Sequence, residues 1–157
     1  MAKNAVMRGR DALSARLAQC YVTIEGRRYN FMQMIDMDAT MEKTKIEVPI
    51  LGQTGDGNKA AGWKGKFKGK AHYNQSVLRS LLLRYKKTGE DVYFDMQIVN
   101  DDPTSAAGRQ SIILTGCNLD GGTLGKFDAD GEYLDEDVNG TFEDWDMPEQ
   151  FRTLSGM

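Results

Sequence analysis

The stretch WKGKFKGKAHY, residues 63–73, alternates between two kinds of side chain. Every second residue from Trp63 to Tyr73 is aromatic or small, and the residues between them are Lys64, Lys66, Lys68, Lys70 and His72. Because successive side chains of a strand point to opposite faces, this pattern predicts a β-strand with one core face and one basic face. The four lysines either follow a phosphate backbone or form a face that is solvated or paired with an acidic strand. The second interpretation is favoured, because the other face carries core residues and not a set of exposed stacking rings.

Other segments also predict strands. Residues 18–25 are rich in β-formers, and a tight turn at Gly26-Arg27 leads into a second run that reaches about Met41, which predicts a hairpin. One face of the second run carries the polar side chains Asp36, Asp38, Thr40 and Glu42. Further strands are expected at residues 45–51, 91–100, 110–119 and 132–142, and Asp135 and Asp137 lie on an acidic face of the last one.

A loop and a helix flank the lysine-rich stretch. Residues 52–62 hold four glycines in eleven positions, which predicts a flexible loop, and they lack the GxxxxGK[ST] pattern of a phosphate-binding loop. Residues 74–88 predict an amphipathic helix that begins at Asn74 or Ser76 and ends at Gly89. Its expected polar side carries Arg79, Lys86 and Lys87.

These segments predict a mainly β protein with one α-helix, folded as an antiparallel β-sandwich or barrel. With 157 residues, of which 40% are hydrophobic, the chain has the size of one domain. We therefore expect a single domain over residues 1–157, with an N-terminal arm at 1–17, the flexible loop at 52–62 and a C-terminal segment at 143–157.

The charge is small in total but divided along the chain. The net charge is -3, yet residues 57–89 hold nine basic residues and no acid, whereas residues 119–151 hold eleven acids and one base. Such regions either neutralise each other within a subunit or present complementary faces to identical neighbours. Both arrangements fit the sequence.

The sequence offers no chemistry for catalysis. It contains no GxSxG or HExxH pattern, and Cys20 and Cys117 form no CxxC cluster, so buried reduced thiols are expected. The acidic stretch 126–137 resembles part of a calcium loop, but Lys126 stands at its first position and Asp137 at its last, which favours a solvated turn. No apolar run reaches the length of a membrane span. We expect no enzyme activity, cofactor, metal site or membrane partner.

The order of the Gly-rich loop, GWKGKFKGKAHY, the helix, YKKTGEDVYFDMQIVNDDPTSAAGRQSIILTGCNLD and KFDADGEYLDEDVNGTFEDWDMPEQF resembles the tail tube proteins of PBSX-type defective prophages and related contractile-tailed phages. The resemblance extends from about Ser14 to Phe151. Its matching residues are Tyr85, Lys87, Gly89, Asp91, Tyr93, Phe94, Gln97, Asp101, Asp102, Phe142, Glu143, Asp144, Trp145, Asp146, Pro148 and Glu149.

The resemblance implies a structural subunit with a fold similar to that of the secreted tube component of type VI systems. Such subunits form hexameric rings that stack into a hollow tube, and sheets from neighbours close into one lumen barrel. The implied partners are copies of itself, the tape-measure protein, a contractile sheath, baseplate and tail terminator proteins, and DNA that passes without specific binding. The implied location is the bacterial host cytoplasm during assembly and then the tail of a virion or phage-like particle.

Within that setting, the residue pattern suggests which surfaces serve which role. Because each neutralised phosphate strengthens DNA retention, an acidic lumen is expected, lined by Asp36, Asp38 and Glu42, with Asp135 and Asp137 behind them. The lysine face would then be turned away from the channel. The lysines and the acidic C-terminal region are candidate mates at the interface between rings.

The loop and the C-terminal segment are further interface candidates. The loop would be ordered by contacts between stacked rings, with Gly55, Asp56, Gly57 and Asn58 at its centre; the alternative is a mobile loop without a role. The last strand is expected to end at Phe142, and Pro148 to stop further pairing. Trp145 and Phe151 would then pack against the subunit's own sheet or a neighbour's.

Two other functions remain open from the residues. A small β-barrel module could bind nucleic acid through the face that carries Lys64, Lys66, Lys68 and Lys70, which predicts salt-sensitive DNA binding by a monomer. A calcium-binding domain is the more remote alternative and predicts a metal-dependent melting shift.

Overall fold

The computed structural model describes residues 7–31 and 34–154, which form two compact units. Of the described residues, the first unit comprises 7–31, 93–116 and 144–154. The second comprises residues 34–92 and 117–143. Both units are built mainly from antiparallel strands, and one α-helix belongs to the second, which confirms the predicted mainly β class. The outer ends of the expected N-terminal arm and C-terminal segment, residues 1–6 and 155–157, lie outside the described residues.

The first unit is one sheet with the strand order β2-β1-β5-β6-β8. Its strands are β1 (Ala18–Ile24), β2 (Arg27–Asn30), β5 (Phe94–Asp101), the first part of β6 (Arg109–Gly122) and β8 (Asp144–Glu149). The predicted hairpin at its start is confirmed: Glu25 and Gly26 both have positive φ, 51° and 80°, between the paired strands β1 and β2. A short 3-10 helix, η1 (Gly9–Asp11), precedes β1.

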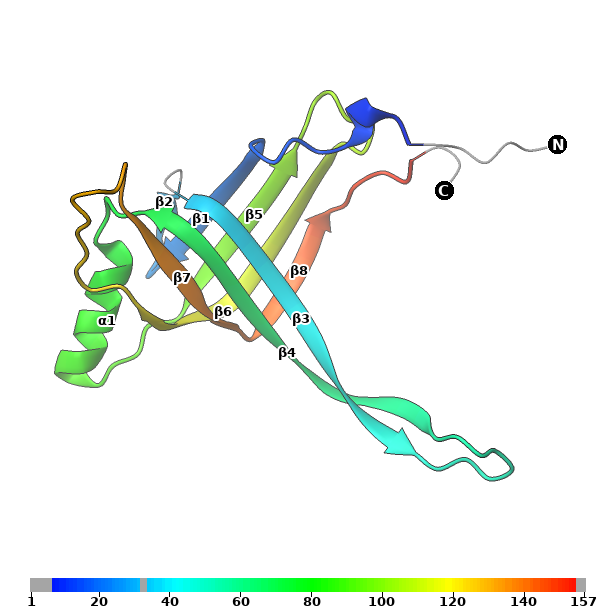
Figure 1. Cartoon of the computed structure of the whole chain (residues 1–157). Coiled ribbons are helices and arrows are strands. Elements are labelled where there is room, and N and C mark those ends of the chain that lie inside the picture. Colours follow the sequence, from blue (N-terminus) through cyan, green and yellow to red (C-terminus); the bar gives the residue numbers. More distant parts are fainter. Residues whose placement is uncertain (1–6, 32–33, 155–157) are drawn as a thin grey trace. The chain divides into compact units, whose positions relative to one another are not determined.

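The second unit is a sheet with the order β6-β7-β4-β3 and the helix α1 (Val77–Thr88). Its strands are β3 (Met34–Val48), β4 (Gly57–His72), β7 (Asp135–Phe142) and the second part of β6, and every neighbouring pair is antiparallel. Figure 1 shows β3 and β4 as a long twisted pair that continues past the end of β7. The positive φ of Gly89, 73°, ends α1 at the predicted residue.

Three sequence-based boundaries are wrong. The expected second hairpin strand is two strands, because β2 ends at Asn30 and β3 starts a new pairing at Met34. The separate strand expected at 45–51 is the end of β3, and residues 57–62 of the expected loop are the start of β4. These residues pair with each other from Lys45 opposite Ala60 to Val48 opposite Gly57, and this pairing overrides the local effect of the glycines. The connection is therefore residues 49–56.

The C-terminal segment also differs from expectation. Residues that were expected to follow the last strand form β8, which pairs with β6 from Thr115 opposite Asp144 to Ser111 opposite Glu149. Pro148 lies within β8. Because β8 is at the edge of its sheet, a residue without an N–H donor is tolerated there.

Large side chains of the second unit pack over glycines on the neighbouring strand. Gly140 of β7 is opposite Phe67 of β4, and Phe142 of β7 is opposite Gly65. Phe67 is 2% exposed and Phe142 is 6% exposed. A Cβ at Gly140 would lie 2.8 Å from Cζ of Phe67 and would also collide with the carbonyl oxygen of Asn118. The glycines therefore set the distance at which the rings close the core face.

Gly140→Ala should lower the free energy of unfolding by roughly 1–3 kcal/mol, because the added methyl overpacks a site bounded by a ring and a backbone oxygen. Chemical denaturation monitored by tryptophan fluorescence measures the change. Gly125→Ala is the matched control, since nothing lies within 4 Å of its Cβ. An equal effect of both substitutions would contradict the packing argument.

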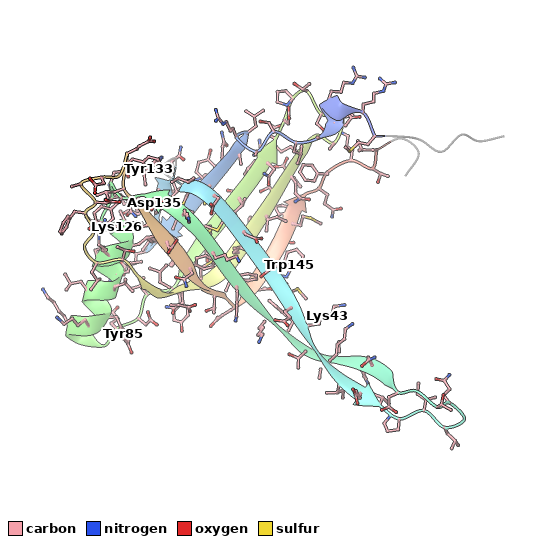
Figure 2. The ribbon with its side chains drawn as sticks, in the orientation of Figure 1. Lys43, Tyr85, Lys126, Tyr133, Asp135 and Trp145 are labelled. Atoms are coloured by element: carbon pink, nitrogen blue, oxygen red, sulfur yellow. The ribbon has the colours of Figure 1, made fainter. Side chains whose placement is uncertain are left out.

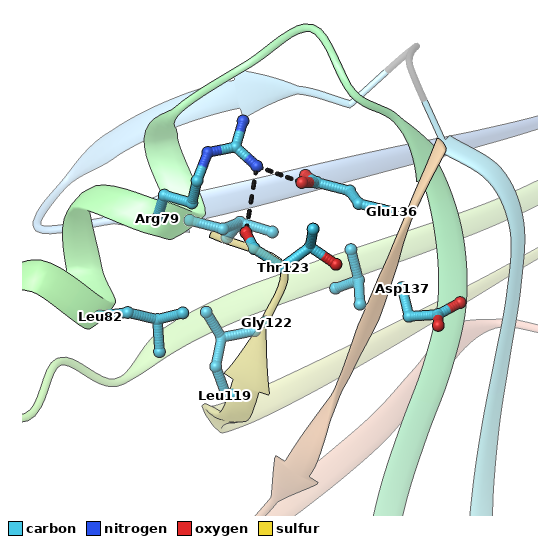
Figure 3. Close-up of a pocket in the computed structure, with 10 residues that line it drawn as sticks. Arg79, Leu82, Leu119, Gly122, Thr123, Glu136 and Asp137 are labelled. Atoms are coloured by element: carbon cyan, nitrogen blue, oxygen red, sulfur yellow. Dashed lines mark hydrogen bonds and ion pairs between the residues drawn. The ribbon is translucent and has the colours of Figure 1, made fainter. Parts of the chain in front are cut away.

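A buried polar cluster attaches α1 to β7 (Figure 3). The guanidinium of Arg79 pairs with the carboxylate of Glu136, which is 5% exposed, and donates to the carbonyl oxygen of Thr123 at 3.4 Å. Nε2 of Gln75 donates to Glu136 at 2.8 Å, and Oε1 of Gln75 accepts from the backbone N–H of Val77 at 2.8 Å. Arg79 therefore does not belong to the solvated side of the helix, and Gln75 supplies the N-terminal hydrogen bond that was expected from Asn74 or Ser76.

In the first unit, Asp102 connects the segment before β1 to the turn after β5. Its two carboxylate oxygens accept the backbone N–H of Ser14 and of Thr104, each at 2.9 Å. These hydrogen bonds, the one from Ser14 first, hold the pKa of Asp102 below its ordinary value of 3.8, and the residue is only 6% exposed. The ionised carboxylate is therefore the form that the fold stabilises.

Asp102→Asn should destabilise the protein at neutral pH. Each oxygen of the carboxylate accepts one backbone N–H, whereas the amide of asparagine has a single acceptor oxygen. Because the pKa of Asp102 is lower in the folded state, its ionisation stabilises the fold at pH values above the ordinary pKa of 3.8. This stabilisation is lost as the pH falls through the pKa of the folded state. The difference in melting temperature between wild type and variant should therefore shrink below about pH 4. Thermal unfolding between neutral and acidic pH measures it, and a difference independent of pH would contradict the assignment.

Candidate assembly surfaces

The acids of β3 and the lysines of β4 lie on one face of the second unit's sheet. Residues directly opposite each other on neighbouring strands share a face, and β4 pairs with β3 on one side and with β7 on the other. We call this surface the charged face. Its rows across β3, β4 and β7 are Asp36-Lys70-Asp137, Asp38-Lys68-Asn139 and Thr40-Lys66-Thr141, followed by the pair Glu42-Lys64.

This register corrects one sequence-based expectation. The lysine face was expected to be turned away from a channel lined by Asp36, Asp38 and Glu42, but each of these acids is directly opposite a lysine on the same face. The side chains of these three acids and of Lys64, Lys66, Lys68 and Lys70 are exposed. Like charges directly opposite each other across a sheet are destabilising, so the alternation of acids and lysines is compatible with this register of β3 on β4 and disfavours one that pairs like charges.

The charged face contains an open depression of about 560 Å³ near its middle. It is lined by Asp36, Met37, Asp38, Lys68, Gly69, Lys70, Asp137, Val138 and Asn139. Oδ1 of Asp36 accepts the backbone N–H of Lys70 at 3.0 Å, which fixes this carboxylate beside the lysine row. The depression combines both signs of charge and is not a concentrated site of one sign.

At the end of the charged face, Asp135 is opposite His72 and is paired with a lysine from the loop that precedes β7. Nζ of Lys126 donates to Oδ1 of Asp135 at 3.0 Å and to its carbonyl oxygen at 2.8 Å. This hydrogen bond raises the pKa of Lys126 and lowers the pKa of Asp135. Figure 2 shows the two residues beside Tyr133, whose ring lies 5.3 Å from that of His72. The negative charge of Asp135 is therefore compensated by Lys126, whereas Asp137 is beside the lysine row.

Beyond β7, the hairpin of β3 and β4 has only two strands. The last pair between β4 and β7 is Gly65 with Phe142, so residues 43–48 and 57–64 have no third strand among the described residues. We call residues 43–64 the arm, and Lys43 marks its base in Figure 2. Exposed apolar side chains on the arm are Ile46, Ile50, Leu51 and Trp63, and Leu51 is fully exposed.

The predicted interface residues of the Gly-rich loop fall at the tip of the arm. Gly55 and Asp56 are in the exposed connection, whereas Gly57 and Asn58 begin β4 opposite Val48 and Glu47. A two-stranded hairpin is at best marginally stable alone in water. The arm, with its exposed apolar side chains, is therefore a candidate contact surface for a partner.

The C-terminal candidates lie on and after β8. Trp145 is opposite Leu114 of β6 and remains 39% exposed, while Phe151 is half-buried after the strand. Arg109 and Glu149 form an ion pair at 3.4 Å between the two strands. Strand pairing, which the sequence did not predict here, is what holds Trp145 against the first unit's sheet.

No described residue set has the composition of a metal site. In the described ranges, no three potential ligands among His, Cys, Asp and Glu come together, and neither Cys20 nor Cys117 forms a disulfide. Burial raises the pKa of the Cys20 thiol to about 11, so it is protonated at neutral pH. The pocket of Figure 3 encloses about 10 Å³, the volume of one water probe. Across the same part of the chain, no helix has the length and apolarity needed to cross a membrane.

Comparison with known proteins decides the family. The model of a phage tail tube protein family matches residues 5–149. The Phage-like element PBSX protein XkdM of Bacillus subtilis (strain 168) is 37% identical over 113 residues, which cover 72% of this chain and 77% of XkdM. This chain belongs to the phage tail tube protein family. The resemblance stated from the sequence motifs is confirmed.

Solved structures show the same fold at low sequence identity. A chain of the anti-feeding prophage cap has a TM-score of 0.66 and 11% identity, covering 93% of this chain and 95% of that chain. A chain of the sheath-tube complex of the PVC extracellular contractile injection system has a TM-score of 0.62 and 10% identity, with coverages of 82% and 87%. Hcp1 from Flavobacterium johnsoniae has a TM-score of 0.50 and 14% identity, with coverages of 85% and 98%. The tail tube fold predicted from the resemblance is confirmed.

Proposed function

We propose that this tail tube subunit assembles with copies of itself into hexameric rings that stack into a hollow conduit for DNA, inside a contractile sheath. The proposal of a ring is supported by the position of β3, a 15-residue strand at the edge of the second unit's sheet. Such an edge presents unpaired backbone donors and acceptors that pair with another chain. Pairing with a neighbouring copy would continue the sheet from subunit to subunit. This is the role of a structural protein and needs no catalytic residue.

The charged face is our proposal for the lining of the bore. It includes the predicted lumen residues Asp36, Asp38, Glu42, Asp135 and Asp137, together with the lysines that the register places among them. The sheet's other face is closed by buried residues such as Phe67 and Val138. The polar face is thus the one available to a water-filled channel.

The arm is our proposal for the contact between stacked rings. Its exposed apolar residues Ile46, Ile50 and Leu51 need a partner to remove them from water, and a head-to-tail neighbour in a stack supplies one. Trp145 and Phe151 are proposed as a second contact on the first unit. The alternative of a loop without a role does not explain the exposed apolar side chains.

The further partners follow from the same proposal. They are the tape-measure protein in the bore, the sheath outside it, and baseplate and tail terminator proteins at the two ends. A chain of a sheath-tube complex and one of a tube-terminating cap share this fold. Assembly would take place in the bacterial host cytoplasm, with the product in the tail of a virion or phage-like particle.

Replacing residues 49–56 by a two-residue Asn-Gly turn between the paired residues Val48 and Gly57 should abolish tube formation while leaving the subunit folded. The short turn is compatible with a hairpin, whereas Leu51 and the tip are lost from the proposed ring contact. Negative-stain microscopy of the purified protein should show hollow tubes for wild type and single rings or monomers for the variant. Circular dichroism and thermal unfolding check that the variant is folded.

A matched control keeps the length of the tip and changes only polar side chains that are not among the interface candidates. Gln53→Ser combined with Thr54→Ser alters two exposed residues and leaves Ile50 and Leu51 in place; this variant should form tubes. Normal tubes from the shortened arm would contradict the ring-contact proposal. A wild-type monomer with salt-sensitive DNA binding would instead favour the nucleic-acid-binding module.

A further inference from the structure

The lysine row of β4 is compensated by carboxylates of both neighbouring strands. Lys64, Lys66, Lys68 and Lys70 carry four positive charges, and Asp36, Asp38, Glu42 and Asp137, in the same cross-strand rows, carry four negative charges. The compensation is uneven along the strand. Lys70 is between two acids, Lys68 and Lys64 are each opposite one, and Lys66 is between Thr40 and Thr141.

We propose that the charged face is a masked phosphate-binding surface, in which the carboxylates of β3 and β7 suppress the affinity of the lysine row for a polyanion. The biological purpose of the masking rests on the proposed function, because a bore that retained DNA would block its passage. The masking itself is a property of the subunit. It concerns residues of the second unit alone.

The unmasked lysine row would suit a nucleic-acid backbone. The four lysines alternate along one strand at a spacing of about 6.6 Å and all are exposed. Each phosphate that such a row neutralises releases counterions and strengthens binding, with a slope of about -0.9 in the logarithm of affinity against the logarithm of salt for duplex DNA. Four contacts of this kind are a substantial electrostatic site.

The carboxylates are placed where they cancel this attraction. Side chains directly opposite across a sheet have Cβ atoms about 4.5–5.5 Å apart, well within the Debye length of about 8–10 Å at moderate salt. A phosphate near a lysine is therefore also near the opposing acid. The hydrogen bond from the Lys70 backbone holds the Asp36 carboxylate in place, so it cannot move away when a polyanion approaches.

The test compares DNA binding by wild type and by the variant Asp36→Asn, Asp38→Asn, Asp137→Asn. Asparagine keeps the side-chain oxygen that accepts the Lys70 N–H. In fluorescence anisotropy with short duplex DNA at about 50 mM salt, the variant should bind at least about tenfold more tightly, with a salt slope steeper by about 2 to 3. Adding Lys66→Gln, Lys68→Gln and Lys70→Gln to the variant should remove the gain.

A control variant separates masking from net charge. Asp128→Asn, Asp130→Asn, Glu132→Gln changes the net charge equally, in an exposed turn of the same unit, and should bind DNA as weakly as wild type. An equal gain in the control, or no gain in the charged-face variant, would overturn the proposal. If thermal unfolding shows that the triple variant is not folded, the single variant Asp38→Asn, which removes the acid opposite Lys68, should still give a smaller gain in DNA affinity.

The same samples distinguish this inference from the proposed function. Negative-stain microscopy of wild type reports tube formation independently of DNA affinity. If wild type forms tubes but the variant gains no DNA affinity, the proposed assembly stands and the masking proposal is overturned. A gain in the variant without wild-type tubes would support the masking and contradict the proposed assembly.

Discussion

The pairing of β4 with β3 on one side and β7 on the other is the constraint on which the second unit depends. Side chains alternate between faces with a period of two, so a single register sets the core and the polar surface together. The pairs that bring Phe67 over Gly140 also bring Lys68 beside Asp38 and Asn139. A slip of one residue would place lysines in the core and aromatic rings in water. Packing and charge therefore enforce the same alignment.

The sequence predicts this alternation but not the partners. The core and basic faces of residues 63–73, the first hairpin and the helix end at Gly89 follow from local patterns, and all are present. That the lysines would face acids required knowing that β3 and β4 form one long hairpin. A signal was available: the acids and the lysines all stand at even positions, on the two sides of a single Gly-rich connection. The glycine content predicted a loop over residues 52–62, so both strands were predicted to be shorter than they are.

Elsewhere the missing information was tertiary. Strand β8 has an acidic, proline-containing sequence with weak strand propensity, and it is a strand because β6 offers it a pairing edge. Arg79 belongs by spacing to a polar helix side, yet Glu136 of β7 draws it into a buried ion pair. In both cases the deciding partner lies far along the chain. The surfaces proposed for assembly depend on the same long-range pairings, so local pattern alone located their residues but not their neighbours.

Neither unit is a continuous piece of the chain. The first unit gathers three segments, and the last of them supplies β8 near the C-terminal end. During synthesis the ribosome must therefore have produced the chain as far as residue 149 before that sheet can have all its strands. Strand β6 extends the same dependence to the second unit, since its residues 109–116 and 117–122 serve different units. The first unit's sheet is thus complete only after residue 149 has been synthesised, and a nascent chain that stops before β8 leaves one edge of β6 without its partner strand.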